Sequence, residues 1–342
     1  MRALLLSAYN QLSVTDVPVP SIGDEDVLVR VRACGICGSD VHGYTGESGR
    51  RIPPIVMGHE AAGVIEDVGA GVTGVAAGDR VTFDSTVSCG RCAFCRRGES
   101  NLCDNRMVLG VSCGDYRRNG AFAEFVSVPA RIVYRLPDSL AFEHAALIEA
   151  VSVAVHAVRR KVPGASDRVV VIGCGMIGLL IIQVLCHEGC REIVAVDVDE
   201  RRRALAAKLG AAKTIDAKQN VAAALKEATA GQGADHAYEV VGRSETVQSA
   251  VRAVRKGRTV TLVGNLAPMV DLPMQEVVTR ELTLLGTCAS SGEYPECIEL
   301  LASGAVNVAP LISVAAPLEE GPVWFDRLHR ADGQLMKVIL RP

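Results

Sequence analysis

The chain has 342 residues, of which 49% are hydrophobic and only 4% aromatic, and its formal net charge is −3. This length is sufficient for about two domains with a sizeable core. Because basic and aromatic side chains are not enriched, we expect no nucleic acid partner.

Two apolar stretches could be mistaken for targeting or membrane segments. The opening "MRALLLSAYN" is not followed by a small-residue cleavage site, so it predicts a first strand. The run "VVVIGCGMIGLLIIQVLC" reaches membrane-spanning length, but three glycines within its first ten residues favour a strand–turn–helix. Without an export signal, the twelve cysteines are expected to be reduced, in a cytoplasmic protein with no membrane partner.

The pattern of elements changes along the chain. Short apolar strands separated by Gly and Pro, such as "DVLVRVRAC", "AAGVIEDVG" and "FAEFVSVP", predict an all-β, barrel-like first part. From Phe142, a helix over "FEHAALIEAVSVAVHAVRRKV" leads into strand–helix alternation, which predicts an α/β doubly wound parallel sheet. The tail, with "PECIELLASG", "APLIS" and "KVILRP", is expected to return to the first part. We therefore predict a discontinuous β-rich domain over 1–151 and 288–342, and a dinucleotide-binding domain over 152–287.

The segment "GCGMIG" follows an apolar strand and opens a helix. Its glycines would permit a tight turn and the close approach of a pyrophosphate to the helix N-terminus. A plainer interpretation is a glycine turn that only packs a helix on a strand, and the full pattern makes this the weaker one. The residues assigned to the cofactor in this turn are Gly173, Gly175, Ile177 and Gly178.

Asp197 ends the next strand, nineteen residues after Gly178. Its carboxylate would accept hydrogen bonds from the adenosine ribose and repel a 2′-phosphate, which favours NAD over NADP. The arginines at 201–203 leave an alternative open, because they could hold a 2′-phosphate or simply form a solvated helix face.

The segment "SCGRCAFCRRGESNLC" places four cysteines at short spacings within a lobe over 88–104. Four thiolates on such short loops can surround one tetrahedral zinc with no open position, as in a structural site. An iron–sulfur cluster would use the same ligand type. Free buried thiols fit poorly, since the segment is polar. The residues assigned to this zinc are Cys89, Cys92, Cys95 and Cys103.

A second group of candidate metal ligands is spread over "CGICGSDVH", "VMGHEAAG" and "LIEAVSVAVHA". Taken singly, Cys37 could be a core thiol, His42 a surface residue and Glu149 a charge on a helix face. His59 and Glu60 are adjacent, and on a regular strand they would point to opposite faces. The two prolines and the glycine of "RIPPIVMG" make a regular strand improbable there, so both side chains are expected to reach one ion.

In this order, the motifs resemble the zinc-dependent medium-chain dehydrogenase/reductase superfamily, and most of all its polyol dehydrogenase branch. The resemblance rests on "ACGICGSDVHGYTG", "PPIVMGHEAAGVIEDVGAGV", the four-cysteine lobe, "LIEAVSVAVHA", "GCGMIG" and "KVILRP". It implies a GroES-like catalytic domain, a Rossmann domain, a homodimer or homotetramer, NAD, and two zinc ions, one catalytic and one structural.

The resemblance also implies residue roles. Cys37, His59 and Glu60 match catalytic zinc ligands, with Glu149 as a carboxylate behind them that can replace a ligand part of the time. Ser39 and His42 match a proton relay. The remaining matches concern the cofactor: Asp197 and Arg202 at the adenosine ribose, and Val263 and Gly264 beneath the nicotinamide.

The implied function is an oxidoreductase that transfers a hydride from a polyol or other secondary alcohol to NAD, giving a ketose or ketone. Gly43, Ala150 and Cys288 stand where sorbitol-oxidising relatives have tyrosine, proline and arginine, so sorbitol itself is not implied. Threonine- or butanediol-type dehydrogenases and a non-catalytic NAD-binding protein are the alternatives. The arginines of the first domain are either ordinary surface residues or charges for an anionic substrate: Arg50, Arg51, Arg117 and Arg118.

Overall fold

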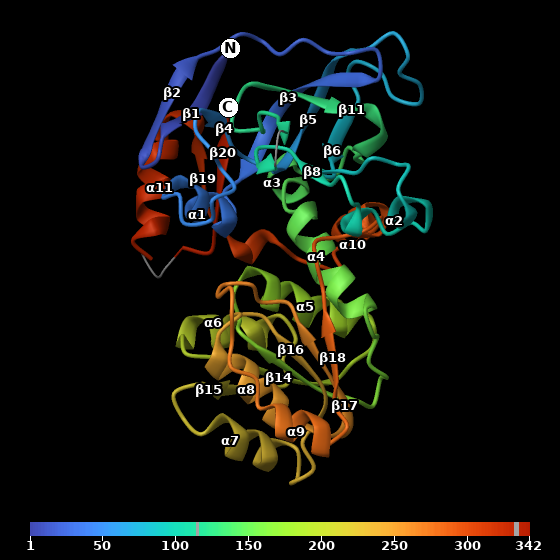
Figure 1. The fold of residues 1–342 in the computed structure, drawn as a ribbon, viewed down its shortest axis with the longest axis vertical. Helices are drawn as coiled ribbons and strands as arrows, with labels where there is room; N and C mark the ends of the chain where they lie inside the picture. Colours follow the sequence, from blue (N-terminus) through green and yellow to red (C-terminus); the bar gives the residue numbers. More distant parts are fainter. Residues whose placement is uncertain (114–115, 332–334) are drawn as a thin grey trace. The chain divides into compact units, whose positions relative to one another are not determined.

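The computed structural model describes residues 1–113, 116–331 and 335–342 (Figure 1). The chain divides into two compact units. Unit 1 comprises Met1–Glu149 and Ser291–Pro342, and unit 2 comprises Ala150–Ser290. A β-rich unit that contains both chain ends and a second unit built on a parallel sheet confirm the predicted fold class.

Unit 1 is built mainly from β-strands. The strands of its two larger sheets are β1 (Arg2–Ala8), β2 (Gln11–Asp16), β3 (Asp26–Gly35), β4 (Ile55–Val56), β5 (Glu60–Val68), β6 (Arg80–Phe83), β11 (Phe125–Pro129), β12 (Val133–Arg135), β19 (Ile312–Pro317) and β20 (Lys337–Arg341). One sheet has the order β12-β6-β5-β3-β20-β19, with β11 also paired to β3, and a smaller sheet has the order β2-β1-β4. Two short pairs are added by β7 (Thr86–Val87) with β8 (Met107–Val108), and β9 (Ser112–Cys113) with β10 (Tyr116–Arg117).

Strand β3 holds unit 1 together. Its buried Val27, Val29 and Val31 alternate with more exposed residues, the two-residue period of a strand with one face in the core. One edge pairs with β5, while the other pairs first with β11 and then with β20. The C-terminal strand β20 is therefore part of the same sheet as β3 and β5.

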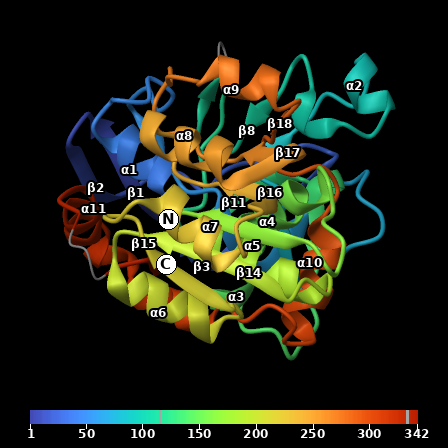
Figure 2. The same ribbon diagram turned by 90° about the horizontal axis from the view of Figure 1, so that it is seen from below.

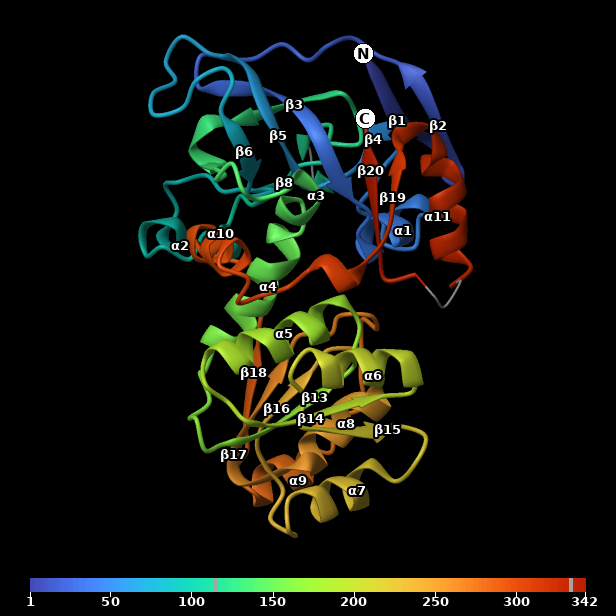
Figure 3. The same ribbon diagram turned by 180° about the vertical axis from the view of Figure 1, so that it is seen from behind.

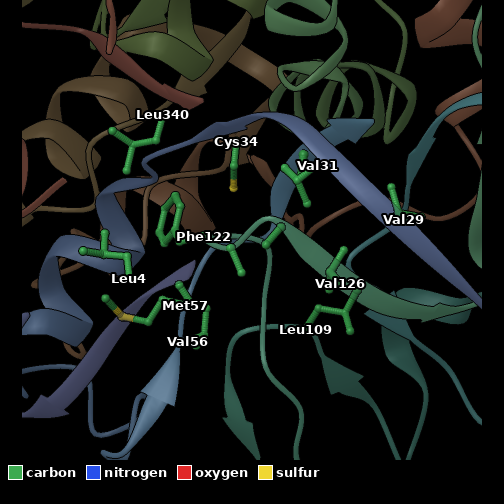
Figure 4. Close-up of a cluster of buried hydrophobic side chains, with 14 of the residues drawn as sticks. Leu4, Val29, Val31, Cys34, Val56, Met57, Leu109, Phe122, Val126 and Leu340 are labelled. Carbon is green, nitrogen blue, oxygen red and sulfur yellow. The ribbon is translucent and has the colours of Figure 1, made fainter. Parts of the chain in front are cut away.

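The core of unit 1 joins side chains that are far apart in the sequence. Leu4, Val31 and Leu340, from β1, β3 and β20, belong to one buried cluster (Figure 4). Phe122 meets Phe325 edge-on, with ring centroids 5.7 Å apart. Such aromatic pairs add to burial, so the return segment is fixed by packing as well as by strand pairing.

The helices of unit 1 are short. They are α1 (Gly38–Tyr44), α2 (Ala93–Arg96), α3 (Phe142–Ala145), α10 (Tyr294–Ala302) and α11 (Gly321–His329), with 3-10 turns η1 (Ser100–Leu102), η2 (Ala130–Ile132), η3 (Ala309–Leu311) and η4 (Leu318–Glu320). Helix α11 packs on β2 (Figure 3). The helix predicted from Phe142 is in fact two, because α4 (Ile148–Arg159) starts after a break, and "APLIS" is mostly the turn η3 ahead of β19.

Unit 2 is a six-stranded sheet in the order β15-β14-β13-β16-β17-β18, and every pair is parallel. The strands are β13 (Arg168–Ile172), β14 (Glu192–Asp197), β15 (Lys213–Asp216), β16 (Ala234–Glu239), β17 (Val254–Leu262) and β18 (Thr283–Gly286). The chain moves outward from β13 through β14 and β15, then crosses to β16 on the other side. This reversal makes the carboxyl ends of β13 and β16 the place where such sheets bind ligands.

Helices cover both faces of the unit 2 sheet. On one face lie α5 (Met176–His187) and α6 (Glu200–Lys208), and on the other α7 (Val221–Ala228), α8 (Ser244–Ala253) and α9 (Met274–Thr279). Figure 2 shows α8 and α9 side by side. The apolar run of residues 169–186 is β13, a turn and α5, as predicted. No helix in the described part of the chain is both long and apolar enough to cross a bilayer.

Candidate metal centres and cofactor site

The four lobe cysteines converge on one point, with all four sulfur atoms within 4.8 Å of one another. The Sγ atom of Cys95 is 3.4 Å from that of Cys92 and 4.0 Å from that of Cys89. Four sulfurs at about 2.3 Å from a tetrahedral zinc would be roughly 3.8 Å apart. The donor set and its spacing therefore fit a closed, structural zinc site: Cys89, Cys92, Cys95 and Cys103.

Backbone amides support these thiolates. The N–H of Cys95 donates to Cys92 Sγ at the start of α2, and the N–H groups of Cys89 and Asn105 donate to Cys103 Sγ, at 3.2 and 3.3 Å. Neighbouring amides lower the pKa values of Cys89 and Cys92, whereas burial raises that of Cys103. Amides directed at sulfur favour the thiolate form, which is the form that binds a metal.

Cys95→Ser is expected to destabilise unit 1, because it removes one of four ligands. Loss of a structural metal is among the largest single-residue effects, at about 4 kcal/mol or more, which corresponds to a fall in Tm of roughly 10 °C. Thermal unfolding together with zinc analysis measures this. The matched control is Cys186→Ser in unit 2, whose sulfur donates only to a backbone carbonyl. Equal Tm and zinc content in Cys95→Ser and in the unaltered chain would contradict the assignment.

A second group lies elsewhere in unit 1, where ligand atoms of Cys37, His59 and Glu60 are also within 4.8 Å of one another. Cys37 is the residue before α1, and β5 begins at Glu60. Between β4 and β5 the chain is irregular, with Gly58 at φ 96°. A Cβ on Gly58 would come within 2.9 Å of Cys34 Sγ and the Phe122 backbone. The glycine thus allows the local backbone that brings both neighbours, His59 and Glu60, to one point.

Asp40 connects this group to the rest of α1. It is fully buried, its Oδ2 accepts the N–H of Cys37 at 3.2 Å, and its Oδ1 accepts from Arg51 Nη2 at 3.0 Å. The same Oδ1 is 3.3 Å from His59 Nδ1, a charge contact that is not aligned for a hydrogen bond. Burial works against the charged form, but His59 and Arg51 outweigh it and hold the pKa of Asp40 well below its usual range. A carboxylate behind a histidine orients the ring for metal binding through its other nitrogen.

Lys337 lies against Glu60. Its Nζ donates to both carboxylate oxygens of Glu60, at 2.6 and 2.8 Å, and to the carbonyl of Ile36 at 3.1 Å. Both side chains are buried. The carboxylate is thus held in place by a lysine from β20 even without a metal.

Glu149, in the first turn of α4, does not belong to the 4.8 Å group. Burial raises the pKa of Glu149 to about 7, with the charge of Glu60 acting in the same direction and those of His59 and Lys337 in the opposite one. The charges of the second group therefore affect the pKa of Glu149, although Glu149 is not one of the three residues in that group.

Ser39 and His42 are on the same short helix, α1. Ser39 Oγ accepts from Arg51 Nη2 at 3.0 Å. His42 is exposed, and its Nδ1 is 3.0 Å from a Glu47 carboxylate oxygen. Ser39 is therefore held by Arg51, whereas His42 contacts solvent.

The glycine turn of unit 2 has the form that a dinucleotide needs. Gly173 has φ 100°, and Gly175 precedes α5. A Cβ on Gly178 would be 1.8 Å from the carbonyl oxygen of Gly173, so no other residue fits. Ile177 lies between them in the first turn of α5, whose free N–H groups can receive a phosphate.

Asp197 lies at the end of β14, next to this turn. Its two carboxylate oxygens accept the N–H groups of Cys174 and Asp199, at 2.7 and 2.8 Å. Arg203 donates to the Asp197 carbonyl and pairs with Asp216, while the N–H of Arg202 donates to the side chain of Asp199. Some groups of these arginines are thus already hydrogen-bonded or ion-paired within the protein.

Val263 and Gly264 follow β17, and both donate their N–H to the carbonyl of Glu239 at the end of β16. A Cβ on Gly264 would be 2.1 Å from the Gly242 nitrogen. The two chain segments therefore approach as closely as glycine allows, at the carboxyl edge of the sheet.

Sequence reasoning missed three residues that contact the second group or its neighbours: Asp40, Arg51 and Lys337. Asp40 lies within "CGICGSDVH", and Lys337 begins an apolar strand, but the sequence around neither residue indicates its partner. The interpretation of Arg51 as a surface arginine is wrong, because it is only 4% exposed. Arg118 pairs with Asp26 at 3.1 Å, whereas Arg117 is exposed and donates to the Ile52 carbonyl.

Comparison with known proteins agrees with these sites. Residues 23–138 match the alcohol dehydrogenase GroES-like domain, and residues 177–303 match the zinc-binding dehydrogenase family. An L-idonate 5-dehydrogenase of Vitis vinifera is 37% identical, covering 92% of this chain and 86% of that protein. A sorbitol dehydrogenase of Bacillus subtilis is 33% identical over 100% of this chain and 97% of its own length. The chain belongs to the zinc-dependent medium-chain dehydrogenase/reductase superfamily.

Solved structures of other dehydrogenases superpose on this dehydrogenase over its whole length. A zinc-binding dehydrogenase from Sinorhizobium meliloti 1021, bound to NADP, has a TM-score of 0.92 and 32% identity, covering 100% of this chain and 99% of that one. A short chain alcohol dehydrogenase from Escherichia coli CFT073, complexed with NADH, has a TM-score of 0.92 and 28% identity over the same shares. Similar folds are thus seen with either nicotinamide cofactor bound.

Proposed function

We propose that this dehydrogenase oxidises a polyol or another secondary alcohol to a ketose or ketone, reducing NAD to NADH with release of a proton. The observation that carries the proposal is the group formed by Cys37, His59 and Glu60, whose ligand atoms lie within 4.8 Å of one another and are held by Asp40 and Lys337. A non-catalytic NAD-binding protein would not need three mutually adjacent ligands braced in this way.

The residues of unit 1 take the following roles in this proposal. When bound, zinc supplies a Lewis acid that lowers the pKa of the substrate hydroxyl, and NAD supplies the hydride acceptor. Cys37, His59 and Glu60 would hold the metal. Ser39 takes the hydroxyl proton and His42 passes it to solvent, since a neutral imidazole ring has one nitrogen that accepts a proton and one that donates a proton. Glu149 would stand behind these ligands as a carboxylate able to replace one of them, which zinc-bound crystal structures with and without cofactor test.

The function is tested by measuring NADH formation with a panel of polyols, their phosphates, threonine and 2,3-butanediol. We expect turnover with at least one polyol or secondary alcohol, and its loss after dialysis against a chelator. NAD binding without turnover on any alcohol would favour the non-catalytic alternative, whereas activity confined to threonine or butanediol would select those branches.

In unit 2, we propose that Gly173, Gly175, Ile177 and Gly178 receive the pyrophosphate of NAD. Asp197 and Arg202 contact the adenosine ribose, and Val263 and Gly264 lie beneath the nicotinamide. The domains that carry these roles are 1–151 with 288–342 for catalysis and 152–287 for the cofactor. We also propose a cytoplasmic homodimer or homotetramer, which light scattering and cell fractionation test.

Asp197→Asn is expected to reduce the preference for NAD over NADP. The charged carboxylate both accepts from the ribose hydroxyls and repels a 2′-phosphate. A hydrogen bond to a charged group contributes about 1.5–3 kcal/mol, so the ratio of kcat/KM for the two cofactors should fall roughly tenfold to a hundredfold. Asp199→Asn, two residues away at the start of α6, is the matched control. A native preference for NADP would contradict the proposal.

A further inference from the structure

Arg51 is buried, which is unusual for an arginine, whereas its neighbour in the chain, Arg50, is exposed. It is 4% exposed, and its Nη2 is 3.0 Å from Ser39 Oγ and 3.0 Å from Asp40 Oδ1. An Nη group carries two hydrogens, so one amino group can donate to both acceptors at once. The serine and the aspartate are neighbours on α1 and are thus held by a single donor.

The space for this arginine is provided by Gly43. A Cβ on Gly43 would lie 2.7 Å from both Cγ and Cδ of Arg51 and 3.0 Å from its Cβ. These atoms are the near part of the side chain, which cannot swing aside as its tip can. The observed position of Arg51 therefore requires glycine at residue 43, and a tyrosine there would exclude it.

Asp40 extends the contact to the metal ligands. Its Oδ2 accepts the N–H of Cys37, and its Oδ1, the atom that Arg51 holds, is 3.3 Å from His59 Nδ1. Displacing Arg51 would leave this buried carboxylate with one donor fewer and free to turn away from His59. The Arg51 guanidinium thus helps to position two of the three ligands, Cys37 and His59, because both contact Asp40.

Ser39 is affected differently. By accepting from Arg51, its oxygen commits one lone pair, which leaves its other lone pair to accept a proton and its own O–H to donate one. A hydroxyl held in this way cannot rotate its acceptor side out of the proton path.

We propose that Arg51 is a positioning residue that holds Ser39 for proton transfer and, through Asp40, holds His59 for zinc binding, and that Gly43 provides the space for its stem. The part concerning Ser39 rests on the proposed function, but the part concerning zinc does not. The two parts are therefore tested separately.

The first experiment measures zinc release to a chelator, without substrate or cofactor, for the native chain, Arg51→Gln, Gly43→Ala and the control Arg50→Gln. Outer-shell partners of metal ligands typically contribute tenfold to a hundredfold in metal affinity or activity. We expect one of the two zinc ions to leave about tenfold faster in Arg51→Gln and in Gly43→Ala, while the other zinc and the control are unchanged.

Gly43→Ala keeps the experiment decisive if Arg51→Gln folds poorly. Alanine is a better helix former than glycine, so this variant is expected to keep its fold while moving the arginine. Native zinc release in both variants overturns the proposal, and native behaviour of Gly43→Ala alone overturns the role given to Gly43. A lower Tm of Arg51→Gln with unchanged zinc release also overturns it, because Arg51 would then be only structural.

The second experiment is a double-mutant cycle between Arg51→Gln and Ser39→Ala, read as kcat with the best alcohol of the panel. If Arg51 acts through Ser39, Arg51→Gln lowers kcat about tenfold in the native chain and much less when Ser39 is absent. Additive effects overturn this part. A native chain that oxidises no alcohol refutes the proposed function instead, and the zinc measurement still decides the role of Arg51.

Discussion

Replacing Cys37 with alanine is expected to lower kcat for alcohol oxidation by at least about a thousandfold. The variant removes the thiolate of the three-residue group, and with it the charge that a zinc ion needs there. Lewis-acid stabilisation by a metal contributes several kcal/mol, and about 4 kcal/mol corresponds to a factor of about a thousand in rate. Steady-state kinetics combined with metal analysis, which should show one zinc per chain instead of two, checks the prediction.

The control for this variant is again Cys186→Ser, a cysteine outside both metal groups. Because Cys37 is only partly buried and the lobe site is untouched, Cys37→Ala should unfold close to the native temperature. This outcome would separate the two metal sites, since Cys95→Ser is expected to have the opposite profile. A preparation that is fully active with a single zinc per chain would refute the assignment.

The parts of the fold that the sequence predicted well are those in which a residue type has a steric reason to be where it is. The turn after β13 is an example, because a side chain at Gly178 would collide with the Gly173 carbonyl at 1.8 Å. The lobe is another, since four thiols on short loops have few uses other than a metal. In both cases the interacting residues are close in the sequence, so spacing alone carries the information.

Prediction failed where the hydrophobic spacing of a helix continues across a break in the helix itself. The spacing from Phe142 onward fits one helix, but the N–H of Leu147 bonds to the carbonyl of His144, three residues back, and α4 begins only at Ile148. The apolar face continues across this tight turn, because Ala146 and Leu147 are both buried. Hydrophobic periodicity reports which side is buried and does not report this change of backbone hydrogen bonding.

In the candidate site, too, residues within short motifs were predicted and a residue with a distant partner was not. Cys37, His59 and Glu60 were predicted from short motifs, together with the irregular chain at Gly58. Lys337 could not be predicted, because its partner Glu60 is 277 residues away in the sequence. A lysine at the start of an apolar strand has the same sequence pattern whether it points to solvent or to a buried carboxylate.

The buried pair of Lys337 and Glu60 leads to the second large effect, a loss of stability in Lys337→Met. The three hydrogens of the ammonium group are matched by three acceptors: both Glu60 oxygens and the Ile36 carbonyl. Methionine has a similar length but no donor. It would leave the Glu60 carboxylate buried and without this cation, which typically costs about 3–5 kcal/mol. Urea unfolding of the metal-free chain measures the effect without interference from zinc. We expect a lower urea midpoint for the variant than for the native chain.

The double variant Lys337→Met with Glu60→Gln distinguishes a lost charge pair from a simple packing defect. Glutamine removes the uncompensated charge and keeps the volume, so most of the lost stability should return, and the two substitutions should not be additive. Additive losses would mean that Lys337 contributes packing alone. If instead the pair is coupled as expected, the lysine on β20 has two effects. It joins the return segment to the sheet that carries Glu60, and it holds that carboxylate in place beside Cys37 and His59.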